Sequence, residues 1–341
     1  MPVNLFLEQT DILLRGAYSF EPQHCIDTLK EEQTIDAVYF PYMINGGFLN
    51  PKIKRVLIKK IPQQFIGERL EYEYVNGQVP KYLCNNYRNR LAKTLPSLRN
   101  KPLVFLHIAD FPFPYETDGN TVIVRCSVNR STMEKKDIVM PARIPYEDWK
   151  GPQVNITSTI GFCGCPHTNS QREQVVQELH GRNDVKTNFF LTPRFYNHLD
   201  LNEWLRSQNP QASDSELEAI TEELKTKLKG TFIKIMEHNI FSFCPRGRGN
   251  YSVRFYETLR AGRIPVMIDS DQVFPCEDII DWNDIVICAQ NTEDMLQKIQ
   301  DWIEHRDLIE VQKRCREIWE RHLHFPAFIE RLPKYIEQSL S

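Results

Sequence analysis

The chain lacks an excess of charge of either sign. Lysine and arginine together number 42 and aspartate and glutamate 45, which gives a formal net charge of −3 over 341 residues. A protein whose main task is to bind nucleic acid usually carries a clear basic excess, because it must neutralise phosphates. We therefore expect no nucleic-acid partner, although a local basic patch is compatible with this balance.

The chain also lacks a long apolar run and a regular cysteine pattern. No 18 apolar residues follow one another, so no membrane span is expected. Met1–Gly16 has polar residues every few positions and no basic segment ahead of an apolar run, unlike a signal peptide. The nine cysteines are odd in number and irregularly spaced, which favours reduced thiols over a disulfide framework. Together these features predict a cytoplasmic protein.

Apolar strand-like runs alternate with helical segments along the chain, without an internal repeat. The expected strands are Ile35–Ile44, Arg55–Ile61, Pro102–Ala109, Thr121–Val128, Asp137–Ile144, Val154–Cys163, Val185–Leu191, Ile240–Phe243, Ile264–Ile268 and Ile285–Cys288. The expected helices are Lys81–Leu98, Ser170–His180, Ser215–Lys229, Phe232–Glu237, Ser252–Ala261, Thr292–His305, Asp307–His322 and Ala327–Ser339. This alternation is typical of α/β proteins with mainly parallel sheets.

A change in composition divides the chain into two expected domains. Pro, Asp, Lys and Gly cluster at Pro145–Pro152, which is typical of a linker. We therefore expect an N-terminal domain over residues 1–150 and a C-terminal domain over residues 151–322. Residues 323–341 are expected to form a C-terminal helix that packs back on the N-terminal domain.

One stretch, Ile240–Asp269, combines a strand, a glycine-containing turn, a helix and a second strand. Gly247 and Gly249 are expected to give the turn backbone angles that other residues avoid, and to let a ligand approach the main chain. Ser252 is the expected N-cap of the helix, and Gly262 suits the position just after its end.

The start of this helix has the properties of an anion site. Its unpaired N–H groups and partial positive charge favour a phosphate. Arg246, Arg248 and Arg254 add fixed charge that pairs well with phosphate oxygens. The alternative is an ordinary βαβ crossover with solvated arginines. The stretch has neither the Gly-Lys-Ser/Thr of a Walker loop nor the G-x-G-x-x-G of a dinucleotide-binding fingerprint.

The same stretch resembles the donor-site signature of exostosin-type glycosyltransferases. The matching segments are Cys-Pro-Arg-Gly at Cys244–Gly247, Ser-x-Arg-Phe-Tyr-Glu at Ser252–Glu257 and Leu-Arg-Ala-Gly-x-Ile-Pro-Val at Leu259–Val266. Weaker likeness extends the resemblance to about residues 100–320, at Pro102–Asp110, Lys136–Pro141, Gly161 through Arg172, and Trp282. The resemblance implies a GT-B architecture, in which two Rossmann-like doubly wound domains face each other across a cleft. The C-terminal domain would hold most of the nucleotide-sugar.

The resemblance assigns roles to three residues of the expected donor site. Glu257 is similar to the acid that accepts hydrogen bonds from the ribose hydroxyls in GT-B enzymes, which suits a carboxylate. Arg254, three residues earlier and on the same helical face, would neutralise the diphosphate as the leaving group departs. An intrahelical pair with Glu257 is the alternative role of Arg254, and the two can coexist. Arg172 is a second diphosphate candidate, whose alternative is an exposed arginine.

The resemblance also bears on stereochemistry. Many retaining GT-B enzymes carry a glutamate eight residues before the ribose-binding one, where this chain has Gly249. This departure favours inversion, which requires a general base near the acceptor hydroxyl, supplied from the N-terminal domain. Asp110, at the end of an apolar run, is the first candidate, and His107 and Glu116 are the alternatives. A loop-capping role would explain Asp110 equally well.

No metal or other cofactor is expected. Cys163, Cys165 and His167 could supply three zinc ligands, but no fourth ligand stands at a familiar spacing. Asp269 and Asp271 match the Asp-x-Asp pattern of manganese-dependent transferases, yet they follow the last strand of the stretch rather than a donor loop.

The expected function is transfer of a sugar from a nucleotide-sugar, preferably a UDP-sugar, to a hydroxyl of an oligosaccharide or glycan acceptor, with inversion and without metal. A second glycosyltransferase that binds this chain is a candidate partner protein. The alternatives are a fucosyltransferase-like GT-B enzyme that uses a GDP-sugar, a non-catalytic nucleotide-sugar-binding partner subunit, and a general nucleotide or RNA binder that uses Arg246–Arg248.

Overall fold

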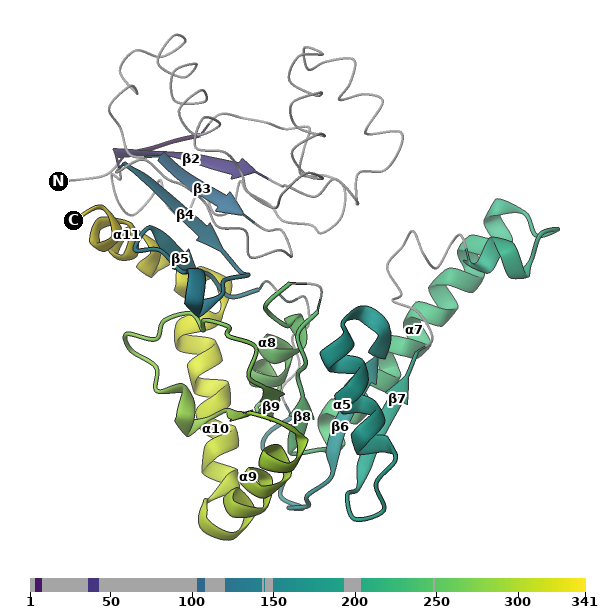
Figure 1. Cartoon of the computed structure of the whole chain (residues 1–341). Coiled ribbons are helices and arrows are strands. Elements are labelled where there is room, and N and C mark those ends of the chain that lie inside the picture. The colour runs from purple at the N-terminus through teal and green to yellow at the C-terminus, as the bar shows by residue number, and fades with distance from the viewer. Residues whose placement is uncertain are drawn as a thin grey trace. The chain divides into compact units, whose positions relative to one another are not determined.

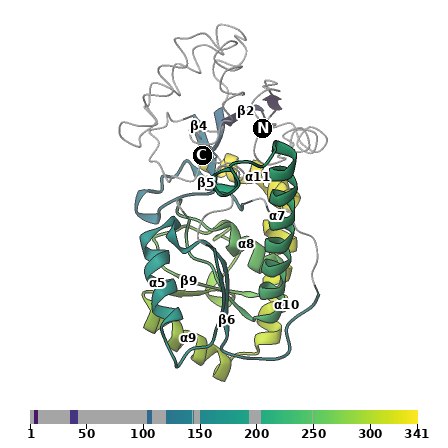
Figure 2. The same ribbon diagram turned by 90° about the vertical axis from the view of Figure 1, so that its right-hand side faces the viewer.

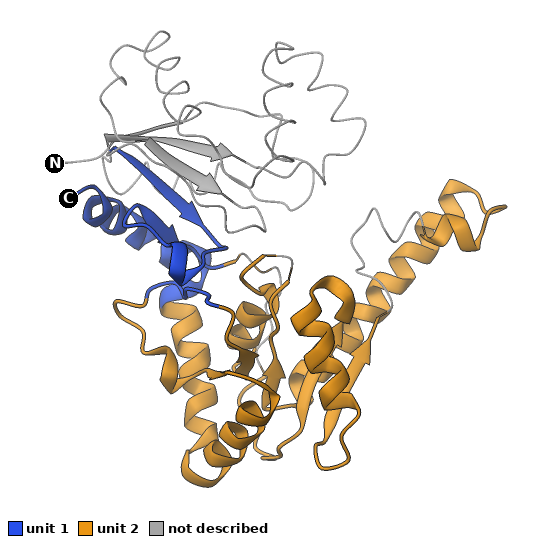
Figure 3. Ribbon diagram, viewed as in Figure 1, with its two compact units in different colours: residues 1–141, 271–276, 322–341 blue, residues 142–270, 277–321 orange. Residues whose placement is uncertain are grey.

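The computed structural model describes residues 120–142, 144, 150–192, 204–247 and 249–341, together with the backbone of three strands nearer the N-terminus (Figure 1). Two compact units result. Unit 1 comprises Met1–Pro141, Asp271–Cys276 and His322–Ser341, and unit 2 comprises Ala142–Ser270 and Glu277–Arg321 (Figure 3). Within the described residues, no helix is both long and apolar enough to cross a membrane.

Unit 1 contains a five-stranded sheet in which every described pair is parallel. Its strands follow chain order, β1 (Asn4–Leu7), β2 (Asp36–Tyr42), β3 (Leu103–His107), β4 (Thr121–Arg125) and β5 (Asp137–Val139). The side chains of β4 and β5 are all buried, as expected for parallel strands covered on both faces.

The C-terminal helix α11 (Phe325–Leu340) packs against β4 and β5 of this sheet. Its buried side chains recur at helical spacing, at Phe328, Ile329, Leu332 and Ile336, which is the pattern of an amphipathic helix that covers a sheet. Lys136 adds a polar tie, because its Nζ donates to the carbonyl oxygen of Ser339 at 2.6 Å. The end of the chain therefore completes the core of unit 1.

Unit 2 contains a second five-stranded parallel sheet, whose strand order reverses. The strands are β6 (Ile160–Gly164), β7 (Thr187–Leu191), β8 (Phe241–Phe243), β9 (Ile264–Ile268) and β10 (Ile287–Ala289), in the spatial order β10-β9-β8-β6-β7. The chain starts inside the sheet, moves outward to β7, and then continues on the other side of β6. This is a doubly wound order, and its reversal lies between β6 and β8.

Five of the helices that the structure describes cover the sheet of unit 2. They are α5 (Ser170–His180), α7 (Asp214–His238), α8 (Val253–Arg260), α9 (Thr292–His305) and α10 (Leu308–Ile318). Figure 2 shows α5 and α9 on one side of the sheet and α7 and α10 on the other. Short helical turns lie at η2 (Arg130–Thr132), η3 (Pro166–Thr168), η4 (Trp282–Asp284) and the π-helix η5 (Trp319–Leu323).

Short polar side chains fix where these helices begin. Asn169 accepts hydrogen bonds from two backbone N–H groups at the start of α5, and Asp307 does the same for α10. Ser213 forms a reciprocal capping box with Glu216 at the start of α7. Each cap satisfies N–H groups that have no partner within the helix.

The α/β class and its parallel sheets are confirmed, and the two units agree with the pair of domains in a GT-B fold. The expected helices at Ser215–Lys229 and Phe232–Glu237 are one helix, the 25-residue α7, because Gly230 weakens a helix by only about 1 kcal/mol and does not end it. The expected elements at Arg55–Ile61 and Lys81–Leu98 lie outside the described residues.

Candidate functional site

The predicted donor residues gather at the carboxyl ends of β6 and β8, where the strand order of unit 2 reverses. In open α/β sheets, ligands usually bind at this position. From β6 the chain continues into Cys165 and the start of α5. From β8 it continues through Cys244–Gly247 into α8. Both segments therefore bring their side chains and free backbone groups to the same edge of the sheet.

Helix α8 begins without a side-chain cap. Ser252 is its N-cap residue, as expected, but the Ser252 hydroxyl makes no capping hydrogen bond. Gly262, just after the helix, has a φ of +57°, the left-handed conformation that favours glycine at this position. Because the N-terminal N–H groups of α8 receive no capping oxygen from Ser252, they remain able to bind an anion.

The backbone of the turn before α8 is not fixed in the way that we expected. Gly247 is not in the left-handed region, and a Cβ there would meet its nearest atoms only at 3.9 and 4.0 Å. Hydrogen bonds hold the turn instead. The N–H of Gly247 donates to the carbonyl of Tyr251, and Asn250 exchanges side-chain hydrogen bonds with Ser270. The expectation that Gly247 supplies unusual backbone angles is therefore wrong.

Arg172 clamps this turn to the end of β6. Its Nε donates to the carbonyl oxygen of Arg246 at 3.0 Å, and its two terminal nitrogens donate to those of Pro245 at 3.0 Å and Cys165 at 3.2 Å. Burial lowers the pKa of Arg172 to about 10, and the positive charge of Arg254 lowers it as well. The guanidinium thus remains charged at neutral pH. Its three nitrogens already donate hydrogen bonds to backbone carbonyl oxygens.

Arg254 lies between two aromatic rings at the start of α8. Its guanidinium carbon is 5.2 Å from the centroid of Phe162, on β6, and 4.9 Å from that of Phe232, on α7. A Cβ at Gly164 would lie 3.5 Å from a terminal nitrogen of Arg254, and Gly164 has a φ of +154°. Among the described side chains and carbonyls, none accepts a hydrogen bond from this guanidinium. Its N–H donors remain available to a ligand.

Glu257 lies one turn further along α8, and its side chain makes no hydrogen bond or ion pair within the described part of the chain. The expected alternative, an ion pair between Arg254 and Glu257, does not form in this structure. Burial raises the pKa of Glu257, while the charges of Arg254 and Arg260 lower it. The side chain is half-buried, and burying part of a carboxylate without a hydrogen-bond partner is costly. Hydroxyl donors from a ligand would compensate this cost.

The remaining predicted donor residues surround the same turn. The Nε of Arg246 is buried and has no hydrogen-bond partner in the described residues, and burial lowers the pKa of this side chain. Gly249 is buried. Arg248 lies outside the described residues, as do Asp110 and Glu116, and only the backbone of His107 is described, at the end of β3. The candidate bases therefore stay predictions.

The residues that we weighed as metal ligands have other partners. His167 pairs with Glu173 at 2.8 Å, and Asp271 accepts hydrogen bonds from the backbone and hydroxyl of Ser131. Burial raises the pKa of Cys163, which disfavours the thiolate that a metal would bind. In the part of the chain that the structure describes, no three His, Cys, Asp or Glu side chains come together as metal ligands.

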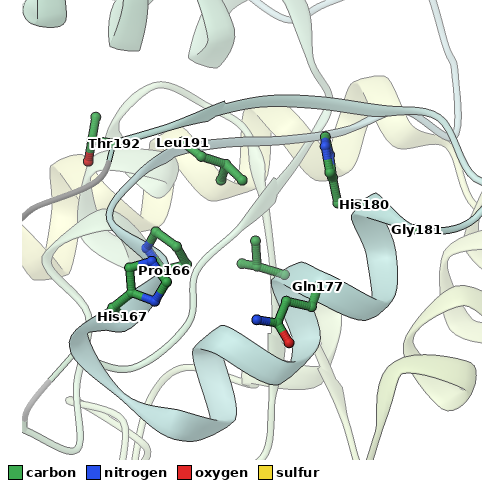
Figure 4. A pocket seen from close by; sticks show the side chains of 8 residues that line it. Pro166, His167, Gln177, His180, Gly181, Leu191 and Thr192 are labelled. Carbon is green, nitrogen blue, oxygen red and sulfur yellow. The ribbon is translucent and has the colours of Figure 1, made fainter.

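A separate pocket of about 510 Å³ lies beside α5, near the end of β7 (Figure 4). It is lined by Pro166, His167, Val176, Gln177, His180, Gly181, Leu191 and Thr192. None of the predicted donor residues lines it. The pocket therefore does not define the site formed by Arg254 and Glu257.

Several residues of the site were not predicted from the sequence. Phe162 and Gly164 fall inside the segment whose resemblance to the family we noted, and they lie two apart on β6, so they share one face of the sheet. Phe232 belongs to a different helix, and no local pattern connects it with Arg254. Asn250 was not among the predicted site residues, although it is buried and its side chain donates a hydrogen bond to the carbonyl oxygen of Ser270.

Comparisons with known proteins agree with the resemblance of the central motif. Exostosin-1 of Drosophila melanogaster is 31% identical over 113 residues, which are 30% of this chain and 15% of that protein. Probable glucuronosyltransferase 47 A of Physcomitrium patens is 33% identical over 92 residues, which are 27% of this chain and 20% of that protein. The matching stretches thus span only a minor part of these relatives.

A solved structure of Alr3699/HepE from Anabaena in complex with UDP aligns over 99% of both chains, with a TM-score of 0.42 and 9% identity. The family comparison is more specific. A model of the exostosin GT47 domain matches residues 135–300, the range that holds Arg172, Arg254 and Glu257. Residues 135–300 of this chain are therefore similar to the exostosin GT47 domain, in agreement with the motif at Cys244–Val266.

Proposed function

We propose that this chain transfers a sugar from a nucleotide-sugar, preferably a UDP-sugar, to a hydroxyl group of a glycan acceptor. The observation that carries the proposal is the pair Arg254 and Glu257. Both lie in the first turns of α8 at the reversal of a doubly wound sheet, and neither side chain has a hydrogen-bond partner among the described residues. Buried or half-buried polar groups usually have partners, so such a pair suggests a bound ligand.

The two side chains suit the two polar parts of a nucleoside diphosphate. Arg254 would bind the diphosphate together with the uncapped start of α8, and the negative charge there grows as the sugar departs. Glu257 would accept hydrogen bonds from the vicinal ribose hydroxyls. Arg172 has a supporting part in this proposal. It holds the carbonyls of Pro245 and Arg246 in place rather than contacting phosphate.

The direct test is the effect of nucleoside diphosphates on thermal unfolding. A ligand that binds only the folded protein raises its stability by about 2.7 kcal/mol at a hundredfold excess over the dissociation constant. Millimolar UDP or GDP should therefore raise the Tm, and the comparison decides between a UDP-sugar and a GDP-sugar donor. Glu257→Ala should weaken nucleotide binding by about 1.5–3 kcal/mol. The absence of a shift with either nucleotide would count heavily against the donor site.

The stereochemical part of the proposal is inversion without a metal, and it rests on Gly249 in place of a glutamate. Asp110 is the proposed base, with His107 and Glu116 as alternatives. Asp110→Asn should lower kcat by about 10²–10⁴-fold and leave nucleotide binding nearly unchanged. NMR of the product formed in the presence of a chelator gives the anomeric outcome. A retained configuration would refute inversion, and loss of turnover in chelator would refute independence from metal.

A cytoplasmic location is a further part of the proposal. It is supported by the cysteines, because all seven in the described residues are free thiols. Labelling of the protein in intact cells with a membrane-permeant thiol reagent should modify only accessible, reduced cysteines. Detection of the protein in a secretory fraction, with thiols blocked by disulfides, would contradict this part.

A further inference from the structure

The guanidinium of Arg254 is held by aromatic side chains from two other elements. We propose that Phe232, on α7, is a positioning residue that keeps Arg254 aligned to bind the diphosphate of the donor. This inference rests on the proposed function. It adds a residue that lies outside the family motif and 22 positions before Arg254 in the sequence.

The geometry places the Arg254 guanidinium carbon 4.9 Å from the centroid of the Phe232 ring and 5.2 Å from that of Phe162. Both distances lie within the range of about 6 Å in which the negative face of a ring attracts a guanidinium. Gly164 lies beside the same group, since a Cβ at that position would be in van der Waals contact, at 3.5 Å, with a terminal nitrogen of Arg254. Arg254 therefore occupies a slot with two aromatic walls.

Aromatic walls hold an arginine without using its hydrogen-bond donors. An arginine presents five N–H donors, and each carbonyl or carboxylate that it contacts takes one of them. Arg172, in the same site, donates to three carbonyl oxygens and is fixed in that way. Arg254 has no such acceptor among the described residues. It is therefore restrained by its rings while its donors stay available to phosphate oxygens.

The two aromatic rings are needed because no other described side chain in the site fixes the guanidinium of Arg254. Arginine has many rotamers, and ordering it costs conformational entropy. The positive charge of Arg254 lies close enough to Arg172 to lower the pKa of Arg172, so the two guanidinium groups repel each other. Without Phe232, Arg254 would move away from Arg172 and from the diphosphate position.

Phe232 can be tested more cleanly than Phe162. Phe162 is only 1% exposed and contacts Phe189 and Phe243, with ring centroids 5.7 and 5.8 Å away, so its replacement would disturb the core. Phe232 is partly exposed on α7. Phe232→Leu removes the ring and keeps most of the apolar volume, and Phe232→Tyr keeps the ring.

The experiment measures the affinity of wild type, Phe232→Leu and Phe232→Tyr for UDP or GDP, whichever raises the wild-type Tm, by isothermal titration calorimetry. Phe232→Leu should weaken diphosphate binding by about 3- to 10-fold, the effect of losing one partly desolvated cation–π contact. Phe232→Tyr should bind like the wild type. The matching nucleoside, followed by NMR titration, should bind all three proteins equally, because it has no phosphate.

Two controls separate positioning from a structural effect. Ile233→Ala shortens the neighbouring residue of α7, so it should lower the Tm and leave the affinity for the diphosphate unchanged. In an Arg254→Gln background, Phe232→Leu should cause no further loss of affinity, since the residue through which it acts is gone. Equal losses with and without Arg254, or an equal loss for the nucleoside, would overturn the inference alone. If the wild type binds neither UDP nor GDP, the proposed function fails and the inference fails with it.

Discussion

Replacing Arg172 tests whether this residue shapes the turn or binds the donor. Arg172→Ala removes three hydrogen bonds from a charged donor to the carbonyls of Cys165, Pro245 and Arg246. One such bond contributes about 1.5–3 kcal/mol, but three bonds from a single group are not additive, and water can reach part of the vacated space. We therefore expect the free energy of unfolding to fall by about 3–5 kcal/mol.

Urea-induced unfolding, followed by tryptophan fluorescence, measures this loss, because Trp282 and Trp302 are buried in the same unit. Arg182→Ala is the matched control. Arg182 lies just after α5 and pairs with Asp184 and Glu293 at the surface, where ion pairs contribute about 0–1 kcal/mol. The control should therefore change the unfolding free energy far less than Arg172→Ala.

Arg172→Lys separates the two possible roles further. Lysine keeps the positive charge but cannot serve three carbonyls in one plane, so a clamp should lose about 2 kcal/mol or more even in this variant. A diphosphate ligand would instead lose nucleotide affinity while the free energy of unfolding stayed within about 1 kcal/mol of the wild type. If Arg172→Ala and Arg172→Lys both lose nucleotide affinity but keep the free energy of unfolding of the wild type, the proposal that Arg172 holds the turn is refuted.

Three further substitutions give shorter tests. Because burial raises the pKa of Glu257, the contribution of this residue to stability falls as pH rises above 4.5, its ordinary value, and Glu257→Gln removes that loss. The Tm of the variant minus that of the wild type should therefore increase as pH rises above 4.5, and a constant difference would contradict the raised pKa. Gly161→Ala should destabilise by about 1–3 kcal/mol in urea unfolding, because the new Cβ would lie 2.9 Å from the amide nitrogen of the buried Asn239; wild-type stability would show that Asn239 moves freely. Ser213→Ala removes the capping box with Glu216 and should cost about 1 kcal/mol by the same assay, and no loss would mean that the start of α7 frays already.

Several elements could be predicted from the sequence with their observed bounds. Ser170–His180, Ile264–Ile268 and Thr292–His305 are helix, strand and helix in the structure. In each helix a polar cap precedes an amphipathic run, and the strand is a short apolar run that follows a glycine. Such signals depend on neighbouring residues in the sequence, so the secondary structure that they predict does not depend on the surrounding fold.

Other features depend on contacts that no local pattern contains. The strand expected over Val154–Cys163 begins only at Ile160, because pairing with β7 and β8 starts there. Similarly, the expected strand over Asp137–Ile144 pairs only as far as Val139. Apolar composition predicts that a segment is buried, whereas the neighbouring strands decide how much of it joins the ladder.

The sequence predicts that Arg172, Arg254 and Glu257 lie near the ends of neighbouring strands, but the separate roles of the two arginines could not be distinguished from the sequence. Arg172 and Arg254 each lie in the first turn of a helix, and each could bind a phosphate. The carbonyl partners of Arg172 at Pro245 and Arg246 come from a loop more than 70 residues away. The ring of Phe232 reaches Arg254 from a helix whose apolar pattern indicates only burial. Tertiary contacts alone separate a structural arginine from one that is available to a ligand.

The difference between these two arginines also explains how the site can be ordered before a ligand arrives. Arg172 fixes the main chain at the beginning of the turn that leads into α8. Phe162 and Phe232 fix the side chain of Arg254 without taking its donors. A diphosphate would therefore meet donors that are already oriented, and less entropy would be lost on binding. Groups that need no reorganisation also stabilise a developing charge most effectively, which is what a departing nucleoside diphosphate requires.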